Sequence, residues 1–204
     1  MGIRIILRRE AAINMFRDLL INTACSNIGD KILICSGFFQ ERKSSRYSAS
    51  SEKNFIHKFK KTKKEIITIG IHNYTWLGSY MNFVNEFRNL GIPIKAFKRK
   101  RFNWHAKMYF LFEKDTPIFA IIGSSNITRN AFSDNVPFNI EADVVLWSDT
   151  RLNYIIDECF NNIAPENYYN VDYSAQNNNG KTIQDRLFDL YKEIMAENVN
   201  DVEI

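Results

Sequence analysis

Within one short window, the sequence carries residue types that together could cleave a phosphodiester. His105 and Lys107 stand two positions apart, and Ser124, Asn126 and Glu141 follow in that order. Such cleavage needs a nucleophile for phosphorus, donors or cations for the non-bridging oxygens, and an acid for the leaving oxygen. A histidine can be the nucleophile or the acid, because its proton equilibrium lies near neutral pH.

A spacing of two predicts that paired side chains share one face of an extended strand. The ammonium of Lys107 would then lie beside the imidazole of His105, where it disfavours imidazolium and leaves the ring free to attack. Ser124 and Asn126 would offer a hydroxyl and an amide donor to the phosphoryl oxygens. Glu141 could accept a hydrogen bond from the other imidazole nitrogen and hold the tautomer. We therefore predict that these five residues form a phosphodiesterase site.

Apolar runs on both sides of the window must position these residues. MYFLF follows Lys107 and IFAIIG ends at Gly123, and both runs predict buried strands. The short Glu113–Pro117 turn between them predicts that the two strands pair. The stretch Ser124–Thr128 resembles a helix start, whose free backbone N–H groups would favour phosphate.

The rest of the chain alternates strand and helix patterns, which predicts a parallel portion of sheet with right-handed crossovers. The other expected strands are Lys31–Phe39, Glu65–His72, Ile92–Phe97 and Ile140–Trp147. The expected helices are Ala11–Asn27, Lys53–Lys63, Trp76–Leu90 and Arg151–Ile163. The pattern of Ile3–Leu7 is ambiguous. We predict an α/β layered sandwich with a mixed central sheet of roughly six or seven strands and helices on both faces.

One main domain is expected, because the 204 residues are 45% hydrophobic and 14% aromatic, which are globular values. Residues 1–165 would form this domain. Residues 166–204 would add a linker over Asn167–Gly180 and a C-terminal amphipathic helix that packs on the domain or on a dimer partner. Thr182 and Asp185 resemble a capping box that opens this helix. Its apolar stripe consists of Ile183, Leu187, Leu190 and Ile194.

H-x-K followed by G-S-x-N resembles the signature of the phospholipase D superfamily, carried here by His105, Lys107, Gly123, Ser124 and Asn126. The resemblance implies a phospholipase D-like fold in which the histidine attacks and forms a phosphohistidine. It also implies that a second histidine, from a second copy of the motif, protonates the leaving group, and that no metal or other cofactor is needed. In several nuclease members a later glutamate supports the histidine, a role that Glu141 would fill.

One position departs from the family pattern. The family often carries an aspartate after four residues beyond the lysine, but Phe112 stands there and Asp115 comes three residues later. Because that aspartate is mainly structural in the family, its absence does not remove the chemistry. The departure indicates a divergent branch.

The chain holds one H-x-K, since neither His57 nor His72 is followed by the rest of the motif. The second histidine would therefore come from another subunit. Single-copy members that resemble this chain are homodimeric nucleases, including metal-independent restriction-type endonucleases. We therefore predict a twofold dimer with one composite site across the interface.

Two basic runs, Lys58–Lys64 and Lys95–Arg101, stand out from a modest net charge of +4. Basic surface of this kind favours a phosphate-rich partner, and we expect DNA rather than RNA. The first run is equally well explained as a solvated face. The second abuts His105. Trp104 could stack on nucleic-acid bases, or it could pack in the hydrophobic core or at a subunit interface. The expected substrate-binding residues are Lys98, Arg99, Lys100, Arg101 and Trp104.

Cysteine usage and the N-terminus predict a cytoplasmic protein. The three cysteines, an odd number without tight spacing, indicate reduced thiols, and no Cys/His cluster has metal-ligand spacing. The first ten residues are too short and too charged for a signal peptide. No apolar run of about 18 residues predicts a membrane span, and we expect no membrane partner.

Three functions are compatible with these residues. A metal-independent endonuclease is favoured over a phospholipid phosphodiesterase, because the sequence shows no export signal or apolar groove. The third is a catalytically inactive nucleic-acid-binding module, which Phe112 keeps open. Salt dependence would separate the first from the second. Loss of turnover in His105→Ala, with binding kept, would separate the first from the third.

Overall fold

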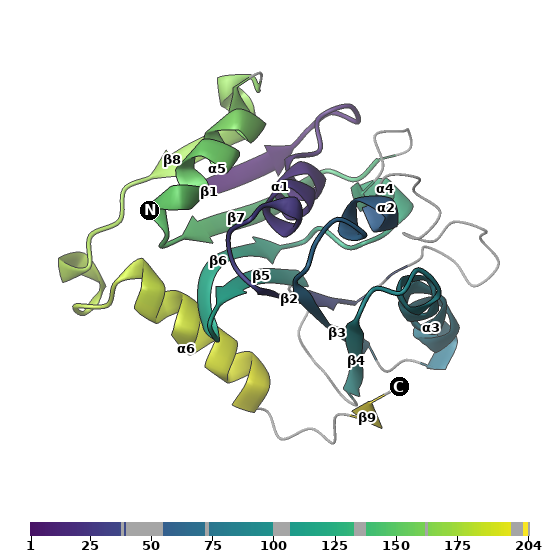
Figure 1. Ribbon diagram of the computed structural model, residues 1–204. Coiled ribbons are helices and arrows are strands. Elements are labelled where there is room, and N and C mark those ends of the chain that lie inside the picture. The colour runs from purple at the N-terminus through teal and green to yellow at the C-terminus, as the bar shows by residue number, and fades with distance from the viewer. Residues whose placement is uncertain are drawn as a thin grey trace.

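The structure, a computed structural model, describes residues 1–37, 39, 55–71, 74–99, 107–132, 138–161, 163–196 and 202–203 (Figure 1). The strands are β1 (Gly2–Arg8), β2 (Lys31–Ser36), β3 (Glu65–Ile71), β4 (Ile94–Arg99), β5 (Lys107–Glu113), β6 (Thr116–Gly123), β7 (Glu141–Trp147), β8 (Tyr168–Val171) and β9 (Val202–Glu203). The helices are α1 (Met15–Cys25), α2 (Phe55–Phe59), α3 (Tyr74–Asn89), α4 (Arg129–Phe132), α5 (Asn153–Phe160) and α6 (Ile183–Ala196), with 3-10 turns at Thr150–Leu152, Pro165–Asn167 and Gln176–Asn178. None of these described helices is long and apolar enough to cross a membrane.

All the described strands join one sheet, in the order β8-β1-β7-β6-β5-β2-β3-β4-β9. β2, β3 and β4 run parallel, as their helical connections through α2 and α3 require. The other neighbouring pairs are antiparallel. The predicted α/β fold with a mixed sheet and a parallel portion is confirmed.

The expected number of strands is too low, because the described sheet has nine. Ile3–Leu7 lies within β1, which pairs with both β7 and β8. β8 falls inside Asn167–Gly180, the expected linker, and β9 pairs with β4 over two residues. Short edge strands owe their conformation to partners that are distant in sequence, so a local pattern does not reveal them.

The β5–β6 hairpin carries the two halves of the motif. Lys107 pairs with Gly123 at its open end, which confirms the expected pairing through the Glu113–Pro117 turn. The turn residues Lys114 and Asp115 have positive φ values of 49° and 64°. A two-residue type I′ hairpin requires positive φ at both positions, so the turn fixes the register of the motif.

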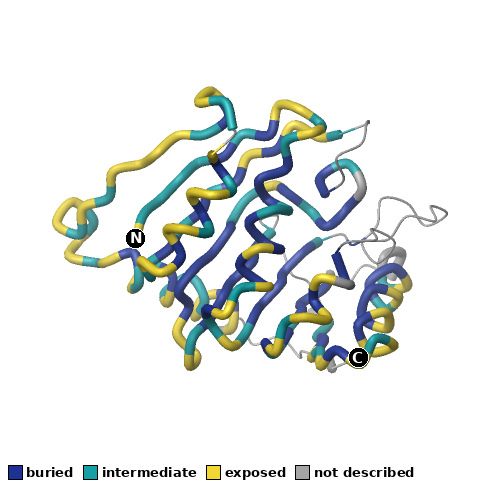
Figure 2. The backbone as a smooth tube through the Cα atoms, turned by 45° about the horizontal axis from the view of Figure 1, so that its top comes forward, coloured by how far each residue is buried: buried dark blue, intermediate teal, exposed yellow. Residues whose placement is uncertain are grey.

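Helices cover both faces of the sheet, as predicted. α1, α2, α3 and α5 pack on one face, and α6 packs on the other (Figure 1). Alternate residues of β5 show the division, since Tyr109 and Leu111 join the first core while Met108, Phe110 and Phe112 join the second. Figure 2 shows the buried residues concentrated along the central strands. The central strands are therefore buried on both faces, which explains their continuous apolar runs.

α6 begins at the capping box that the sequence predicts. The backbone N–H of Thr182 donates to Asp185 Oδ2 at 2.8 Å, and the N–H of Asp185 donates to Thr182 Oγ1 at 3.1 Å. Leu187 and Ile194 of the apolar stripe are fully buried against the sheet. In this structure the stripe docks on the chain's own sheet.

Candidate active site

Four neighbouring strands, β7, β6, β5 and β2, each begin or end at the same end of the sheet, and they bring most of the predicted site residues together there. β5 begins with Lys107, which pairs with Gly123 at the end of β6, and Gly123 pairs with Asp143 near the start of β7. Ser36, the last residue of β2, lies beside the start of β5. His105 precedes β5 by two residues and lies outside the described residues.

The polar side chains at these strand ends point to the same face of the sheet. Side chains alternate along a strand. An even number of positions along the strand separates each polar residue from a buried residue of the core under α1, α2, α3 and α5. This holds for Ser36, Lys107, Glu141 and Asp143. Their side chains therefore lie on that face and not on the face that α6 covers.

Ser124 and Glu141 are hydrogen-bonded to each other. The hydroxyl of Ser124 donates to Glu141 Oε2 and accepts from the backbone N–H of Ala142 at 3.0 Å. Asn139 Nδ2 donates to the other carboxylate oxygen of Glu141, also at 3.0 Å. Because each carboxylate oxygen can accept two hydrogen bonds, Glu141 keeps the capacity to accept one from an imidazole.

A second carboxylate holds Ser125, the variable residue of the motif. The backbone N–H of Ser125 donates to Asp143 Oδ1 at 3.1 Å, and its hydroxyl donates to Asp143 Oδ2 at 2.6 Å. Both residues are buried, and Asp143 is only 3% exposed. Consecutive serines thus bind two carboxylates that stand two residues apart on β7, which anchors the end of β6 to that strand.

Asn126 contacts β2 on the other side of the motif. The hydroxyl of Ser36 donates to Asn126 Oδ1 at 3.5 Å, and the backbone N–H of Ile127 donates to Ser36 Oγ at 3.4 Å. Within the described part of the chain, the Nδ2 group of Asn126 has no hydrogen-bond partner, so its donors are available to a ligand. Ser36 therefore positions the motif.

Burial and charge act in opposite directions on Lys107. Burial lowers the pKa of its ammonium, while the negative charges of Glu141 and Asp143 raise it, and the net shift is downward. Burial also raises the pKa of Asp143 to about 6, against the effect of its hydrogen bonds from Ser125. Ionisable groups with shifted pKa values gathered at one strand edge are typical of catalytic sites.

The predicted substrate-binding residues are only partly described. Lys98 of β4 pairs with Gly70 of β3, which in turn pairs with Ser36 of β2, so these residues lie side by side across three strands. Because it stands two residues after Ala96, a member of the first core, its side chain lies on the face of the site. Outside the described residues lie the side chain of Arg99 and all of Lys100, Arg101 and Trp104.

A short helix does follow the helix start expected at Ser124–Thr128, since the N–H of Phe132 donates to the carbonyl of Thr128. It begins at Arg129 and has four residues. Three of the N–H groups that would have favoured phosphate are already used, since those of Ser124 and Ser125 donate to β7 and that of Ile127 donates to Ser36. The motif is therefore held by strand contacts and not by a helix terminus.

Sequence reasoning missed Asp143 and Ser125. A signal was present for the first, because Glu141 and Asp143 stand two apart on an expected strand and so share a face. No such signal marks Arg8, whose buried guanidinium donates to the carbonyl of Asn130 from 122 residues away in the sequence and helps to anchor the segment after the motif.

A family profile described as the NgoFVII restriction endonuclease N-terminal PLD domain matches residues 15–165. The chain belongs to this family. The match includes the β5–β6 hairpin and β7, so the resemblance to the phospholipase D superfamily drawn from H-x-K and G-S-x-N is confirmed. No curated protein matches this PLD domain in sequence.

Solved structures resemble this PLD domain at low sequence identity. Phosphatidylserine synthase from Haemophilus influenzae Rd KW20 gives a TM-score of 0.50 at 12% identity, covering 95% of this chain and 46% of that one. Polyphosphate kinase from Porphyromonas gingivalis gives 0.47 at 14%, covering 76% and 26%. TrmBL2, an archaeal chromatin protein, gives 0.37 at 12%, covering 78% and 50%. The PLD domain thus spans half or less of each. The first likeness confirms the expected phospholipase D-like fold and nothing beyond the fold.

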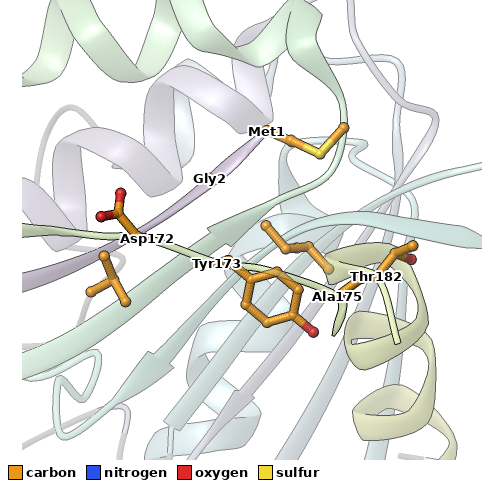
Figure 3. A pocket seen from close by; sticks show the side chains of 8 residues that line it. Met1, Gly2, Asp172, Tyr173, Ala175 and Thr182 are labelled. Atoms are coloured by element: carbon orange, nitrogen blue, oxygen red, sulfur yellow. The ribbon is translucent and has the colours of Figure 1, made fainter. Parts of the chain in front are cut away.

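A cavity of about 290 Å³ lies beside the first two residues of the chain (Figure 3). It is lined by Met1, Gly2, Val171, Asp172, Tyr173, Ala175, Thr182 and Ile183. Gly2 pairs with Trp147, at the opposite end of β7 from Glu141. A strand of this length spans about 20 Å, so the cavity is separate from the candidate site.

Proposed function

We propose that this PLD domain is the catalytic part of a metal-independent endonuclease that hydrolyses nucleic-acid phosphodiester bonds. The observation that carries the proposal is the convergence of Lys107, Ser124, Asn126 and Glu141 at the sheet edge where β5 begins, two residues after His105. The family match supports a nuclease, because the matching profile is named for a restriction endonuclease.

In the proposed reaction, His105 attacks phosphorus, so that a P–N bond forms while the P–O bond to the leaving group breaks. The partner's His105 gives a proton to the leaving oxygen. Water then gives a proton to that second histidine and attacks the phosphohistidine. This step breaks the P–N bond, releases a phosphomonoester and restores both histidines.

The described residues would support both steps through charge and hydrogen bonds. Lys107 and the Nδ2 donors of Asn126 would hold the non-bridging oxygens, where negative charge is greatest in the transition state. Glu141 would accept from the second nitrogen of His105 and so fix the tautomer that attacks. Ser124 donates to Glu141, and in this proposal its hydroxyl turns to a phosphoryl oxygen when the substrate binds.

Cleavage in excess EDTA tests the reaction. Wild type and His105→Ala are incubated with labelled single- and double-stranded DNA and RNA, and we expect cleavage by the wild type alone, with DNA preferred. Ser124→Ala should be slower, while Ser148→Ala is a matched control, because its hydroxyl bonds to Gln184 beyond the other end of β7. If neither wild type nor His105→Ala cleaves while both bind nucleic acid, the endonuclease proposal fails, and lipid phosphodiesters become the next substrates to test.

A homodimer would complete the site, because the chain supplies one H-x-K. Co-expression of wild type with His105→Ala in equal amounts tests this directly. If each site needs both histidines, random pairing leaves about one quarter of the wild-type activity. About one half would remain if each chain acted alone, and that result would contradict the composite site.

A further inference from the structure

The glycine of G-S-x-N is small because a carboxylate occupies the space beside it. The φ of Gly123 lies outside the left-handed region, so backbone conformation does not require glycine there. A Cβ at this position would overlap Asp143 Oδ1 and the carbonyl oxygen of Ala142. Gly123 and Asp143 therefore form one structural unit, and the motif extends to a residue that lies 20 positions further on.

Gly123 also lies between two charged residues in the register of the sheet. It pairs with Lys107 on one side and with Asp143 on the other. Neighbouring strands are about 4.8 Å apart, and both side chains lie on the face of the site. Because Gly123 has no side chain, the carboxylate of Asp143 extends into the space beside it, on the same face of the sheet as the side chain of Lys107.

We propose, building on the proposed function, that Asp143 is a positioning residue of the reaction. It fixes the Ser124–Asn126 segment through Ser125, and its charge holds the ammonium of Lys107 on the face of the sheet where a phosphoryl oxygen would bind. The two tasks need different properties of the side chain. The first needs hydrogen-bonding atoms, and the second needs negative charge.

A purely structural role would not call for a charge. Burial of a carboxylate is costly, and an asparagine could accept from the N–H of Ser125 and donate to its hydroxyl without that cost. Among the described residues, the charged groups on the site face near Asp143 are Lys107 on β5 and Glu141 on β7, with Arg8 of β1 paired in register with Glu141. The charges of Glu141 and Asp143, in that order, raise the pKa of Lys107 against the effect of burial.

Two substitutions at one position separate the two tasks. Asp143→Asn keeps the hydrogen bonds to Ser125 and removes the charge, so the pKa of Lys107 should fall and the alkaline limb of kcat should move to lower pH. Asp143→Ala also releases the motif, and kcat should fall about 100-fold. Ser125→Ala is the matched control, because it removes one hydrogen bond and leaves the charge, so the alkaline limb should stay in place.

The titration of Lys107 can also be followed without any turnover. NMR of the chain with ¹³C-labelled lysine, with the Lys107 signal assigned by its loss in Lys107→Met, reports that pKa directly. An unchanged Lys107 pKa and an unchanged alkaline limb in Asp143→Asn would overturn the proposal. If the wild type cleaves no nucleic acid, the proposed function fails, while the NMR titration still decides whether Asp143 holds Lys107.

Discussion

Restoring the aspartate of the phospholipase D pattern should damage this protein. Phe112 stands at that position, is 1% exposed and belongs to the core under α6. Its ring packs edge-on against Tyr191 of α6, with the ring centroids 4.9 Å apart. Phe112→Asp would therefore replace a contact between sheet and helix by a buried carboxylate.

The expected loss follows from two costs. Truncation of a buried phenylalanine costs about 3 to 5 kcal/mol, and burial of a polar group without a partner adds at least about 1 kcal/mol. Lys31 Nζ lies 5.2 Å from the ring centroid but is already paired with Asp115, so it gives little relief. We expect Phe112→Asp to lower the free energy of unfolding by about 4 kcal/mol or more, and Phe112→Leu by about 1 to 2 kcal/mol.

Urea unfolding followed by circular dichroism measures both losses. Cleavage per folded molecule provides the control, because Phe112 lies five residues along β5 from Lys107, or about 17 Å. Phe112→Leu should therefore cleave like the wild type once folded. A Phe112→Asp protein as stable as the wild type would refute the packing argument. Higher activity in that variant would mean that the family's aspartate serves the reaction itself.

Three further predictions use unfolding measurements. Gly123→Ala should lower the free energy of unfolding by at least about 2 kcal/mol, because the added Cβ clashes with Asp143. Gly78→Ala in α3 is the control, since its added Cβ meets nothing within 4 Å, and it should leave the free energy of unfolding unchanged or raise it by up to about 1 kcal/mol. Equal effects of the two substitutions would contradict the close contact between Gly123 and Asp143. The pKa of Asp143 is raised to about 6 in the folded chain from about 3.9 unfolded, so its stabilising contribution is full below about pH 4 and falls by about 3 kcal/mol as pH rises through 6. Asp143→Asn should remove this pH dependence of the free energy of unfolding, which urea unfolding at several pH values measures. The same pH dependence in Asp143→Asn and the wild type would contradict the prediction. Thr182→Ala should lower the free energy of unfolding by about 1 kcal/mol. Asp185→Ala should have a similar effect, and the double variant should lose no more than either single variant. Additive losses would contradict a cap in which Thr182 and Asp185 depend on each other.

The elements around the motif could be predicted because burial leaves a clear pattern in the sequence. β5 and β6 are buried on both faces, so their apolar runs are continuous, and the short turn between them predicts that these two strands pair. β8 gives no comparable signal, since Tyr169 is 51% exposed and Val171 is 37% exposed. Its strand conformation depends on β1, which lies at the other end of the chain.

The contacts inside the site depend on register, which a local pattern does not contain. Sequence reasoning assigned Ser124 to a phosphoryl oxygen and Glu141 to His105, as if each group met only the substrate or the nucleophile. The pairing of β6 with β7 instead brings these two side chains into a hydrogen bond. Their roles toward a substrate stay predictions, but the structure adds a connection that substitution at either position would disturb.

The described parts of the two basic runs lie before β3 and along its neighbour β4, which separates what they can do. Lys58–Lys64 leads into the first residue of β3, and Lys64 itself is buried and donates to the carbonyl of Ser26, so this end of the run serves the fold. Lys98 lies near the end of β4, on the face and in the row of the site. Three strand spacings, about 14 Å, separate it from Lys107. Within the proposed function, a nucleic-acid strand whose scissile phosphate sits at Lys107 can cross the ends of β2 and β3 toward Lys98, whereas Lys58–Lys64 lies a full strand length away from that phosphate.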